Sequence, residues 1–242
     1  MDKRRTYYLT IDTETANGLE DPMVYDIGGA IHDRKGIVYE TFSFVVSDIF
    51  NGMADLMQSA YYANKLPNYR KELENGTREL KSLYECKKHI HEICEQYHVV
   101  AIIAHNARFD YNSLTKTERY LTKSKYRFFL PYGIEVWDTM KMAKDVFGHN
   151  SRYISFCQKN GYMTKHRTPR PQMKAETIYK YLTKDTDFTE SHTGLEDVLI
   201  EKEIFAFCMR QRTLSHKKLW EDPIEKPKPK KMTYLEKVMA LL

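Results

Sequence analysis

The sequence has 242 residues, a hydrophobic fraction of 42% and a formal net charge of +5 at pH 7. This length fits one large or two small domains with a substantial buried core, and the mild charge allows a polyanionic partner without requiring one. No apolar run approaches the roughly 18 residues of a membrane span, so the sequence predicts no membrane association.

The N-terminal region predicts three strands in succession. Thr6–Ile11 is rich in aromatic and β-branched residues, and Met23–His32 and Ile37–Val46 have a similar strand character. Asp33–Gly36 is a plausible hairpin turn between the second and third strands. We therefore expect these three strands to form an antiparallel meander.

The pattern from about residue 51 to 97 is helical, with breaks near Leu66–Asn68 and at Asn75–Gly76. Val99–Ala104 follows and is apolar throughout, as expected for a central strand covered on both faces. The segment 51–97 is therefore predicted to be a helical insertion or lid that precedes the fourth strand.

The next segments alternate between helix and strand. We expect a helix from about Ala107 to Thr122, a fifth strand near Ile134–Asp138 and a helix after it. Three further helices are predicted, at Ser151–Asn160, Ala175–Leu182 and Thr193–Gln211. This order predicts an α/β fold with a five-stranded mixed sheet, three antiparallel strands then parallel ones, flanked by helices.

The C-terminal region has a different composition. We assign residues 1–212 to one domain and residues 213–242 to a linker and a short helix. Lys226–Lys231 alternates lysine with proline, which is typical of a semi-rigid linker. Thr233–Leu242 predicts a short amphipathic helix that either docks on the body or binds a protein partner through residues 232–242.

The cysteines and the N-terminus bear on the compartment. Cys86, Cys94, Cys157 and Cys208 are scattered and lack C-x-x-C spacing, so we expect reduced, mostly buried thiols rather than disulfides or zinc ligands. Met1–Arg5 lacks the apolar stretch of a signal peptide. Both features predict a cytoplasmic protein.

Asp12 and Glu14 lie where the first apolar run ends. Residues two apart in a strand project to the same face, so the two carboxylates repel each other unless a cation lies between them. Mg²⁺ and Mn²⁺ take oxygen ligands of this kind. The competing interpretation is a pair of solvated charges at a strand end.

Two helix starts each bring a histidine and an aspartate together. Taking Asn106 as N-cap puts Asp110 at the fourth helical position, with His105 just before the cap. In the same way, a Thr193–Glu196 capping box puts His192 before the cap and Asp197 at the fourth position.

Each pair has a purely structural interpretation, a local hydrogen bond that fixes the helix entry. If all three segments converge, however, Asp12, Glu14, Asp110 and Asp197 form a cluster of four carboxylates. Two divalent cations would neutralise such a cluster and create a site for phosphoryl transfer. Spacing alone does not choose between His105 and His192 as a general base.

These three motifs resemble those of the DEDDh 3′–5′ exonucleases, which include the proofreading epsilon subunit, ribonuclease T and oligoribonuclease. The D-x-E, H-N-A-x-F-D and H-x-x-x-x-D motifs match in order and spacing, over about residues 6–211. The resemblance implies an RNase H-like fold. Gly194, where the family often has alanine, and Val198, where a smaller residue is common, depart from the pattern.

The resemblance also implies an activity, metal-dependent release of 5′-mononucleotides from a 3′ end. It makes His192 the general base and gives two divalent cations, Mg²⁺ or Mn²⁺, four ligands, Asp12, Glu14, Asp110 and Asp197. The predicted substrate contacts are Thr15, Ala16, His105, Asn106, Phe109, Lys165, Arg167 and Arg170. Phe109 would stack on a base, although an aromatic residue in a helix more often belongs to the core.

The expected partner is single-stranded nucleic acid or a 3′ end, with DNA favoured. One alternative is an RNA-processing exoribonuclease with the same site, because no feature of the sequence predicts or excludes a contact with a 2′-hydroxyl. The other is a non-catalytic nucleic-acid-binding scaffold. Lys165–Arg170 is either a phosphate-contacting loop or an ordinary solvated surface loop.

Overall fold

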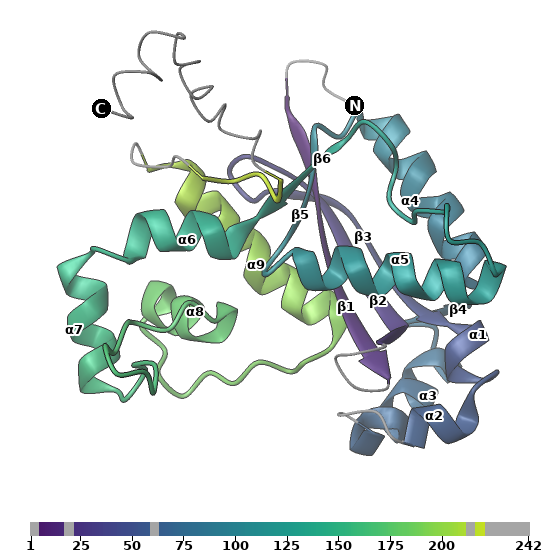
Figure 1. The fold of residues 1–242 in the computed structure, drawn as a ribbon, viewed down its shortest axis with the longest axis horizontal. Coiled ribbons are helices and arrows are strands. Elements are labelled where there is room, and N and C mark those ends of the chain that lie inside the picture. The colour runs from purple at the N-terminus through teal and green to yellow at the C-terminus, as the bar shows by residue number, and fades with distance from the viewer. Residues whose placement is uncertain (1–4, 17–21, 59–62, 212–215, 221–242) are drawn as a thin grey trace, which may run out of the picture.

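Figure 1 shows the computed structural model of the chain, which describes residues 5–16, 22–58, 63–211 and 216–220. Within these ranges, six strands form one mixed sheet in the order β4-β3-β2-β1-β5-β6. The strands are β1 (Tyr7–Ala16), β2 (Met23–Asp33), β3 (Val38–Val46), β4 (Glu79–Lys81), β5 (Ala101–Ala104) and β6 (Glu135–Asp138). The helices are α1 (Ser47–Phe50), α2 (Ala54–Gln58), η1 (Ala63–Lys65, a 3₁₀-helix), α3 (Leu66–Glu74), α4 (Leu83–Tyr97), α5 (Arg108–Thr122), α6 (Thr139–Phe147), α7 (Ser151–Lys159), α8 (Ala175–Thr183) and α9 (Gly194–Met209).

The strand directions confirm the predicted α/β class. β1 to β3 form the antiparallel meander, and β5 and β6 then run parallel to β1. The turn between β2 and β3 is also as predicted, because Gly36 has a φ of 84° and its N–H donates to the carbonyl of Asp33. The sheet is that of an RNase H-like fold.

The predicted count of five strands missed β4, which runs parallel to β3 at the sheet edge. β4 has three residues, and Leu80 between its two charged ends is 45% exposed, so no apolar alternation marks it. The break predicted near Leu66–Asn68 lies where η1 ends and α3 begins. Pro67 is in the first turn of α3, where the missing N–H of proline costs nothing.

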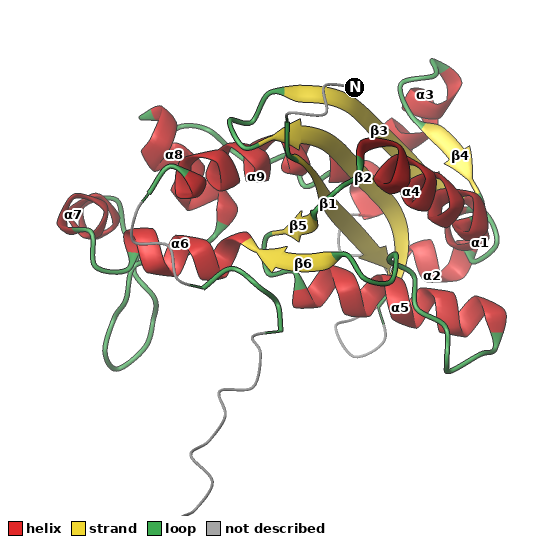
Figure 2. Ribbon diagram, turned by 90° about the horizontal axis from the view of Figure 1, so that it is seen from above, coloured by secondary structure: helices red, strands yellow, loops and turns green. Residues whose placement is uncertain are grey.

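The two faces of the sheet are covered by different helices. Tyr7, Leu9 and Ile11 of β1 pack into one core cluster together with residues of α4 and α5. Tyr8 points to the other face and packs on Phe205 of α9, with ring centroids 4.8 Å apart. The helices α5 and α9 thus lie on opposite faces of β1 (Figure 2).

The end of the described chain returns to the sheet. The N–H of Leu219 donates to Val136 and that of Asp138 donates to Lys217, both at 2.7 Å. The remainder of the predicted linker and C-terminal helix lies outside the described residues. Among the residues that are described, no helix is long and apolar enough to cross a membrane.

The four cysteines are all buried free thiols, as the sequence predicted. Burial raises the pKa of Cys86, Cys94 and Cys208 to about 12. These thiols are therefore structural and unreactive.

Candidate active site

β1 carries two carboxylates toward α9. Asp12 and Glu14 alternate with residues that face the opposite core, so both project to the same side of the sheet. The strand continues through both residues to Ala16, and the strand end predicted at Ile11 was therefore too early. A register shift in the pairing with β2 follows Glu14 directly, so the two carboxylates lie on regular strand immediately before an irregularity.

Thr13 joins β1 to the start of α5. Its backbone N–H and its hydroxyl both donate to Oδ1 of Asp110, at 3.1 and 2.8 Å. Asp110 is in the first turn of α5 and only 2% exposed. Since Thr13 lies between Asp12 and Glu14, these two bonds hold the third carboxylate beside the first two.

The entry into α5 differs from the prediction. The helix begins at Arg108 after Ala107, so Asn106 is not the N-cap and Asp110 is the third helical residue rather than the fourth. Asn106 instead has a left-handed backbone with φ of 67°, and its N–H donates to Oδ1 of Asp138 at 3.0 Å. Asp138 ends the neighbouring strand β6, so it is this tertiary contact that shifts the helix start.

His105 points away from Asp110, and the predicted contact between them was wrong. Its Nε2 donates to the carbonyl of Met173 at 2.6 Å, and its Nδ1 pairs with the Thr139 hydroxyl at 2.8 Å. Burial lowers the pKa of His105, which favours this neutral tautomer. Both ring nitrogens are engaged, which leaves His105 no means of accepting a proton from a substrate.

The third motif starts α9 as predicted, but with a different cap. Thr193 precedes the first helical residue, Gly194, and Asp197 is at the fourth position. The Thr193 hydroxyl donates to the Glu196 carboxylate rather than accepting from the backbone, so the predicted capping box is incomplete. The N–H of Gly194 donates instead to the buried carboxylate of Asp26, at 3.0 Å.

Two glycines let α9 approach the sheet. A Cβ placed on Gly28 of β2 would lie 2.1 Å from the backbone carbon of Gly194, and one on Gly194 would lie 2.5 Å from the backbone nitrogen of Gly28. Neither position tolerates a side chain without movement of the backbone. This contact explains the departure at Gly194 and brings the first turns of α9, with Asp197, against β1.

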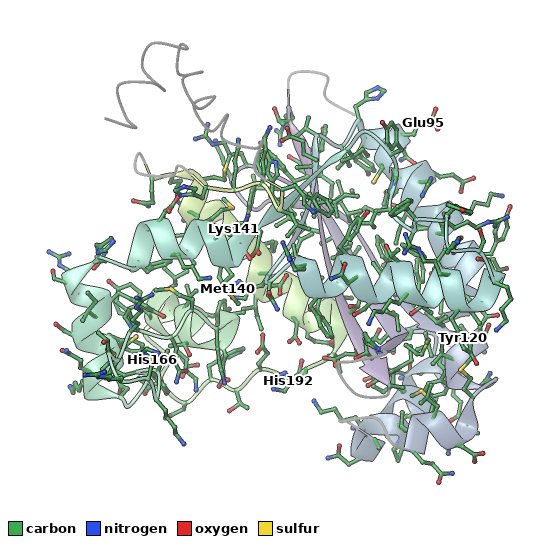
Figure 3. The ribbon with its side chains drawn as sticks, viewed as in Figure 1. Glu95, Tyr120, Met140, Lys141, His166 and His192 are labelled. Carbon is green, nitrogen blue, oxygen red and sulfur yellow. The ribbon has the colours of Figure 1, made fainter. Side chains whose placement is uncertain are left out.

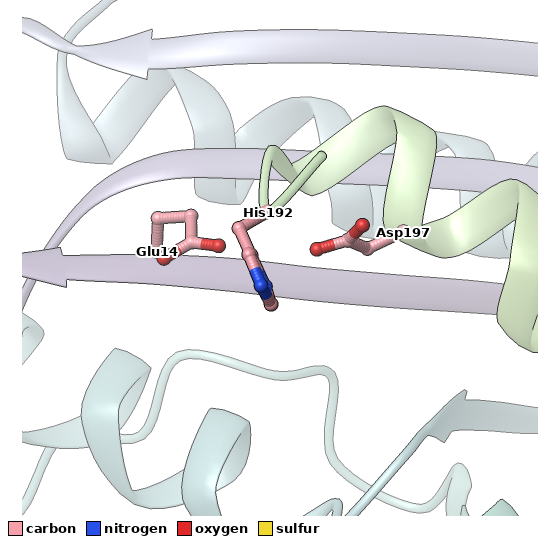
Figure 4. A group of neighbouring side chains, drawn as sticks. All are labelled: Glu14, His192 and Asp197. Atoms are coloured by element: carbon pink, nitrogen blue, oxygen red, sulfur yellow. The ribbon is translucent and has the colours of Figure 1, made fainter. Parts of the chain in front are cut away.

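Glu14, His192 and Asp197 face one another at this contact (Figure 4). Each offers one ligand atom, and these atoms lie within 4.8 Å of one another. His192 has a left-handed backbone with φ of 54°, and its side chain is 38% exposed. Its Nδ1 lies 3.8 Å from Oε2 of Glu190, which precedes the motif.

It is unfavourable for all the carboxylates of the cluster to be ionised at once. Burial, followed by repulsion from neighbouring carboxylates, raises the pKa of Glu14 to about 9 and that of Asp197 to about 8. Burial also raises the pKa of Asp110 to about 7, and burial with four acidic neighbours raises that of Asp12 well above its usual range. Oδ1 of Asp197 is buried and has no hydrogen-bond partner among the described residues. The cluster fits hard divalent cations, because its ligands are carboxylate oxygens that repel one another and one of them has no hydrogen-bond partner among the described residues.

Glu201 is a fifth buried carboxylate that the sequence motifs did not indicate. It lies one helical turn after Asp197, is 3% exposed, and its Oε2 accepts from the backbone N–H of His105 at 3.1 Å. Burial raises its pKa well above the usual range, with Asp110 and Asp197 the next causes. The signal available in the sequence was its i+4 spacing from Asp197, which puts both on one face of α9.

Asp26 and Arg78 form a second unforeseen group, which ties the segment between β3 and α4 to α9. Both are buried, and Asp26 accepts from Arg78 at 3.1 Å and from the Tyr69 hydroxyl at 2.6 Å. Arg78 also reaches the carboxylates of Glu72 and, at 3.3 Å, Glu196. The start of α9 thus rests on an ion-pair network supplied by the predicted insertion.

Lys65 brings a positive charge to the same edge. Its amine donates to the carbonyl of Ser191, just before His192. Partial burial lowers the pKa of His192, and the charges of Lys65 and Lys174 lower it further. His192 is therefore neutral at pH 7 and able to accept a proton.

The predicted substrate contacts beside the motifs differ in accessibility. Thr15 and Phe109 are half-buried and Asn106 is exposed. Ala16 is fully buried in the core cluster of α4 and α5, so its side chain is not available to a ligand.

The predicted phosphate-contacting segment is a surface loop that projects from the rest of the fold. Thr164 and Arg170 close it, with the N–H of Thr164 donating to the carbonyl of Arg170 at 2.8 Å. Lys165 and Arg167 are exposed in the tip, and Figure 3 shows the neighbouring His166 well to one side of His192. These two cations are therefore away from the carboxylate cluster.

No protein-family model matches the sequence, and neither does any curated protein. Solved structures do match. A 3′-exonuclease described in 3′-end-specific recognition of a histone mRNA stem-loop has a TM-score of 0.59 at 14% identity, covering 88% of this chain and 66% of that one. A full-length 3′-exonuclease has a TM-score of 0.55 at 16% identity, covering 84% and 81%. S. pombe Pop2p, in a form with Mg²⁺ and Mn²⁺ bound, has a TM-score of 0.45 at 14% identity, covering 85% and 83%.

At these identities the likeness establishes a fold. It is the fold of 3′-exonucleases, which confirms at this level the resemblance that the three sequence motifs indicated.

Proposed function

We propose that the chain is a metal-dependent 3′–5′ exonuclease that hydrolyses phosphodiester bonds and releases 5′-mononucleotides. The observation that carries this proposal is the convergence of Glu14, His192 and Asp197, from two segments far apart in sequence, within 4.8 Å. Asp110 joins them through Thr13. A purely structural role gives no reason to bury so many like charges together.

The four carboxylates of Asp12, Glu14, Asp110 and Asp197 would hold two divalent cations, with Mg²⁺ and Mn²⁺ the best match to an all-oxygen site. When bound, the cations stabilise the charge that develops on the phosphoryl group. Glu201 behind them would keep Asp197 and the start of α5 in place through its bond to the His105 backbone.

His192 would act as the general base. It is accessible to water, held neutral by its surroundings, and adjacent to Glu14 and Asp197. A neutral imidazole at this position accepts the proton of the attacking water while Glu190, 3.8 Å from Nδ1, stabilises the imidazolium that forms.

The test is digestion of 5′-labelled single-stranded DNA and RNA of one sequence, with Mg²⁺, Mn²⁺ or EDTA. We expect a ladder that shortens from the 3′ end, requires the cation and is absent in Asp12→Asn. The matched control is Asp55→Asn, which removes an exposed carboxylate in α2 and should digest normally. A full-length strand in every lane, with folded protein by circular dichroism, would refute the exonuclease and favour a binding protein.

A further inference from the structure

A cavity of about 830 Å³ lies between α6 and the segment that leads into α8. Its volume is within the range of ordinary small-molecule sites. It is lined, among others, by Met140, Lys144, His149, Arg170, Met173 and Lys174. None of the carboxylates of the candidate active site lines it.

The cavity combines positive charge with apolar surface. Lys144, Arg170 and Lys174 are cations with exposed side chains, and no residue that lines the cavity is acidic. Met140 and Met173 are half-buried and offer polarizable thioethers, which make favourable contacts with aromatic rings. A nucleotide has the complementary features, because it joins a phosphate to a flat aromatic base.

The cavity lies beside residues that flank the candidate active site. The carbonyl of Met173 accepts from Nε2 of His105 at 2.6 Å, and Lys144 is close enough to lower the pKa of His105. The positive charge of Lys174 acts in the same way on His192, at the edge of the carboxylate cluster. A nucleic-acid strand whose 3′ end lies at the carboxylates would therefore pass close to the positive charges of this cavity.

We propose that this cavity binds a nucleotide of the substrate strand on the 5′ side of the one being removed. Its base lies against Met140 and Met173, and its phosphates face Lys144 and Arg170. This assignment rests on the proposed exonuclease function for the origin of the strand, although binding of the strand is measurable by itself.

The assignment separates residues that the sequence grouped together. Of the three cations predicted to contact phosphate, only Arg170 lines the cavity, whereas Lys165 and Arg167 are in the exposed tip of the same loop. Lys165→Ala/Arg167→Ala therefore removes the same charge as Lys144→Ala/Arg170→Ala without touching the cavity, and it serves as the matched control.

The experiment measures binding of a fluorescent eight-nucleotide single strand, dT₈ or rU₈, to the full chain in EDTA over a range of salt. We expect Lys144→Ala/Arg170→Ala to weaken binding at 0.1 M salt by about tenfold or more, and to reduce the log–log salt slope by about 1.4, for two lost phosphate contacts. The control pair should change both quantities by less than half as much.

A third variant tests the base contact. Met140→Ala should weaken binding several-fold without changing the salt slope, because the lost contact carries no charge. Equal effects of the two charge pairs, or an unchanged affinity in the cavity pair, would overturn the assignment.

The two proposals fail differently. Loss of binding in the cavity pair, with no shortening of the strand by wild type in Mg²⁺, leaves the cavity assigned and refutes the exonuclease. Shortening by wild type, with binding unaffected in the cavity pair, does the reverse.

Discussion

His105 and His192 each precede a helix that carries a site aspartate, but their surroundings give them different tasks. His105 is engaged at both ring nitrogens, while His192 is 38% exposed beside Glu14 and Asp197. We expect His192→Gln to lower turnover by about 10²- to 10⁴-fold, with strand affinity nearly unchanged. His105→Gln should chiefly lower the unfolding temperature and retain measurable turnover. The reverse pattern, in single-turnover and binding assays, would return the base role to His105.

His32 of β2 predicts an acid-sensitive fold. It is fully buried, bonded to the Thr10 hydroxyl and the Asp33 carbonyl, and burial lowers its pKa to about 4. Because this lies below the unfolded value of about 6.5, the unfolded chain binds the proton more strongly, and stability falls as the pH drops through this interval.

The expected loss from His32 is about 2 kcal/mol between pH 7.5 and pH 5. Urea unfolding of wild type and His32→Gln at both pH values measures it, since the free-energy difference between the two proteins isolates this group from other titrations. A difference that does not change with pH would show that the pKa of His32 is the same in the folded and the unfolded chain.

The site residues divide into those that spacing reveals and those that only packing reveals. Asp12, Asp110 and Asp197 were predicted from a D-x-E pair after an apolar run and from two helix starts, all of which the chain marks locally. Asp26 carries no local mark and Glu201 only its i+4 spacing from Asp197, because the importance of both comes from contacts with residues 168 and 96 positions away. The sequence motifs therefore indicate the carboxylates proposed as metal ligands, but not the buried groups that hold them in place.

At the scale of elements, the buried Arg78–Asp26 pair helps to link α9 to the segment before α4. Arg78→Met leaves Asp26 buried without its cation, which costs about 3–5 kcal/mol. Arg70→Met, at an exposed position of α3, is the matched control and should cost little. Chemical denaturation of both variants decides this, and equal stability of the two would mean that Tyr69 and Gly194 alone suffice to hold the Asp26 carboxylate.

Element boundaries were predictable where the cause is local and not where it is tertiary. The predicted start of α9 at Thr193 was right, while that of α5 was one residue early because Asp138 of a neighbouring strand binds Asn106. β4 was invisible in the pattern because its pairing with β3, not its own three residues, makes it a strand.

The whole molecule is organised around β1, which shares one core with α4 and α5 and another with α9. The alternation of strands and helices sufficed to predict this architecture, because a parallel β5 and β6 require helical crossovers on the faces of the sheet. The close approach of α9 to the sheet was not predictable, since it depends on Gly28 meeting Gly194.

This architecture places mutually repelling carboxylates at the centre of the fold, so global stability should depend on metal and on pH together. The folded pKa values of Asp110, Asp197 and Glu14, about 7, 8 and 9, all lie above their unfolded values. The folded chain therefore holds these protons more tightly, and its stability falls as the pH rises through these values.

In EDTA we expect a loss of roughly 4 kcal/mol between pH 7 and pH 9, which Mg²⁺ or Mn²⁺ should restore because a cation binds the folded cluster and not the unfolded chain. Denaturant titrations of wild type and Asp197→Asn, with and without cation, measure both effects. Asp197→Asn removes one repelling charge and one ligand, so it should lose less stability at high pH and gain less from the cation. If the cation stabilises the two proteins equally, it binds elsewhere, and the carboxylate cluster is not its site.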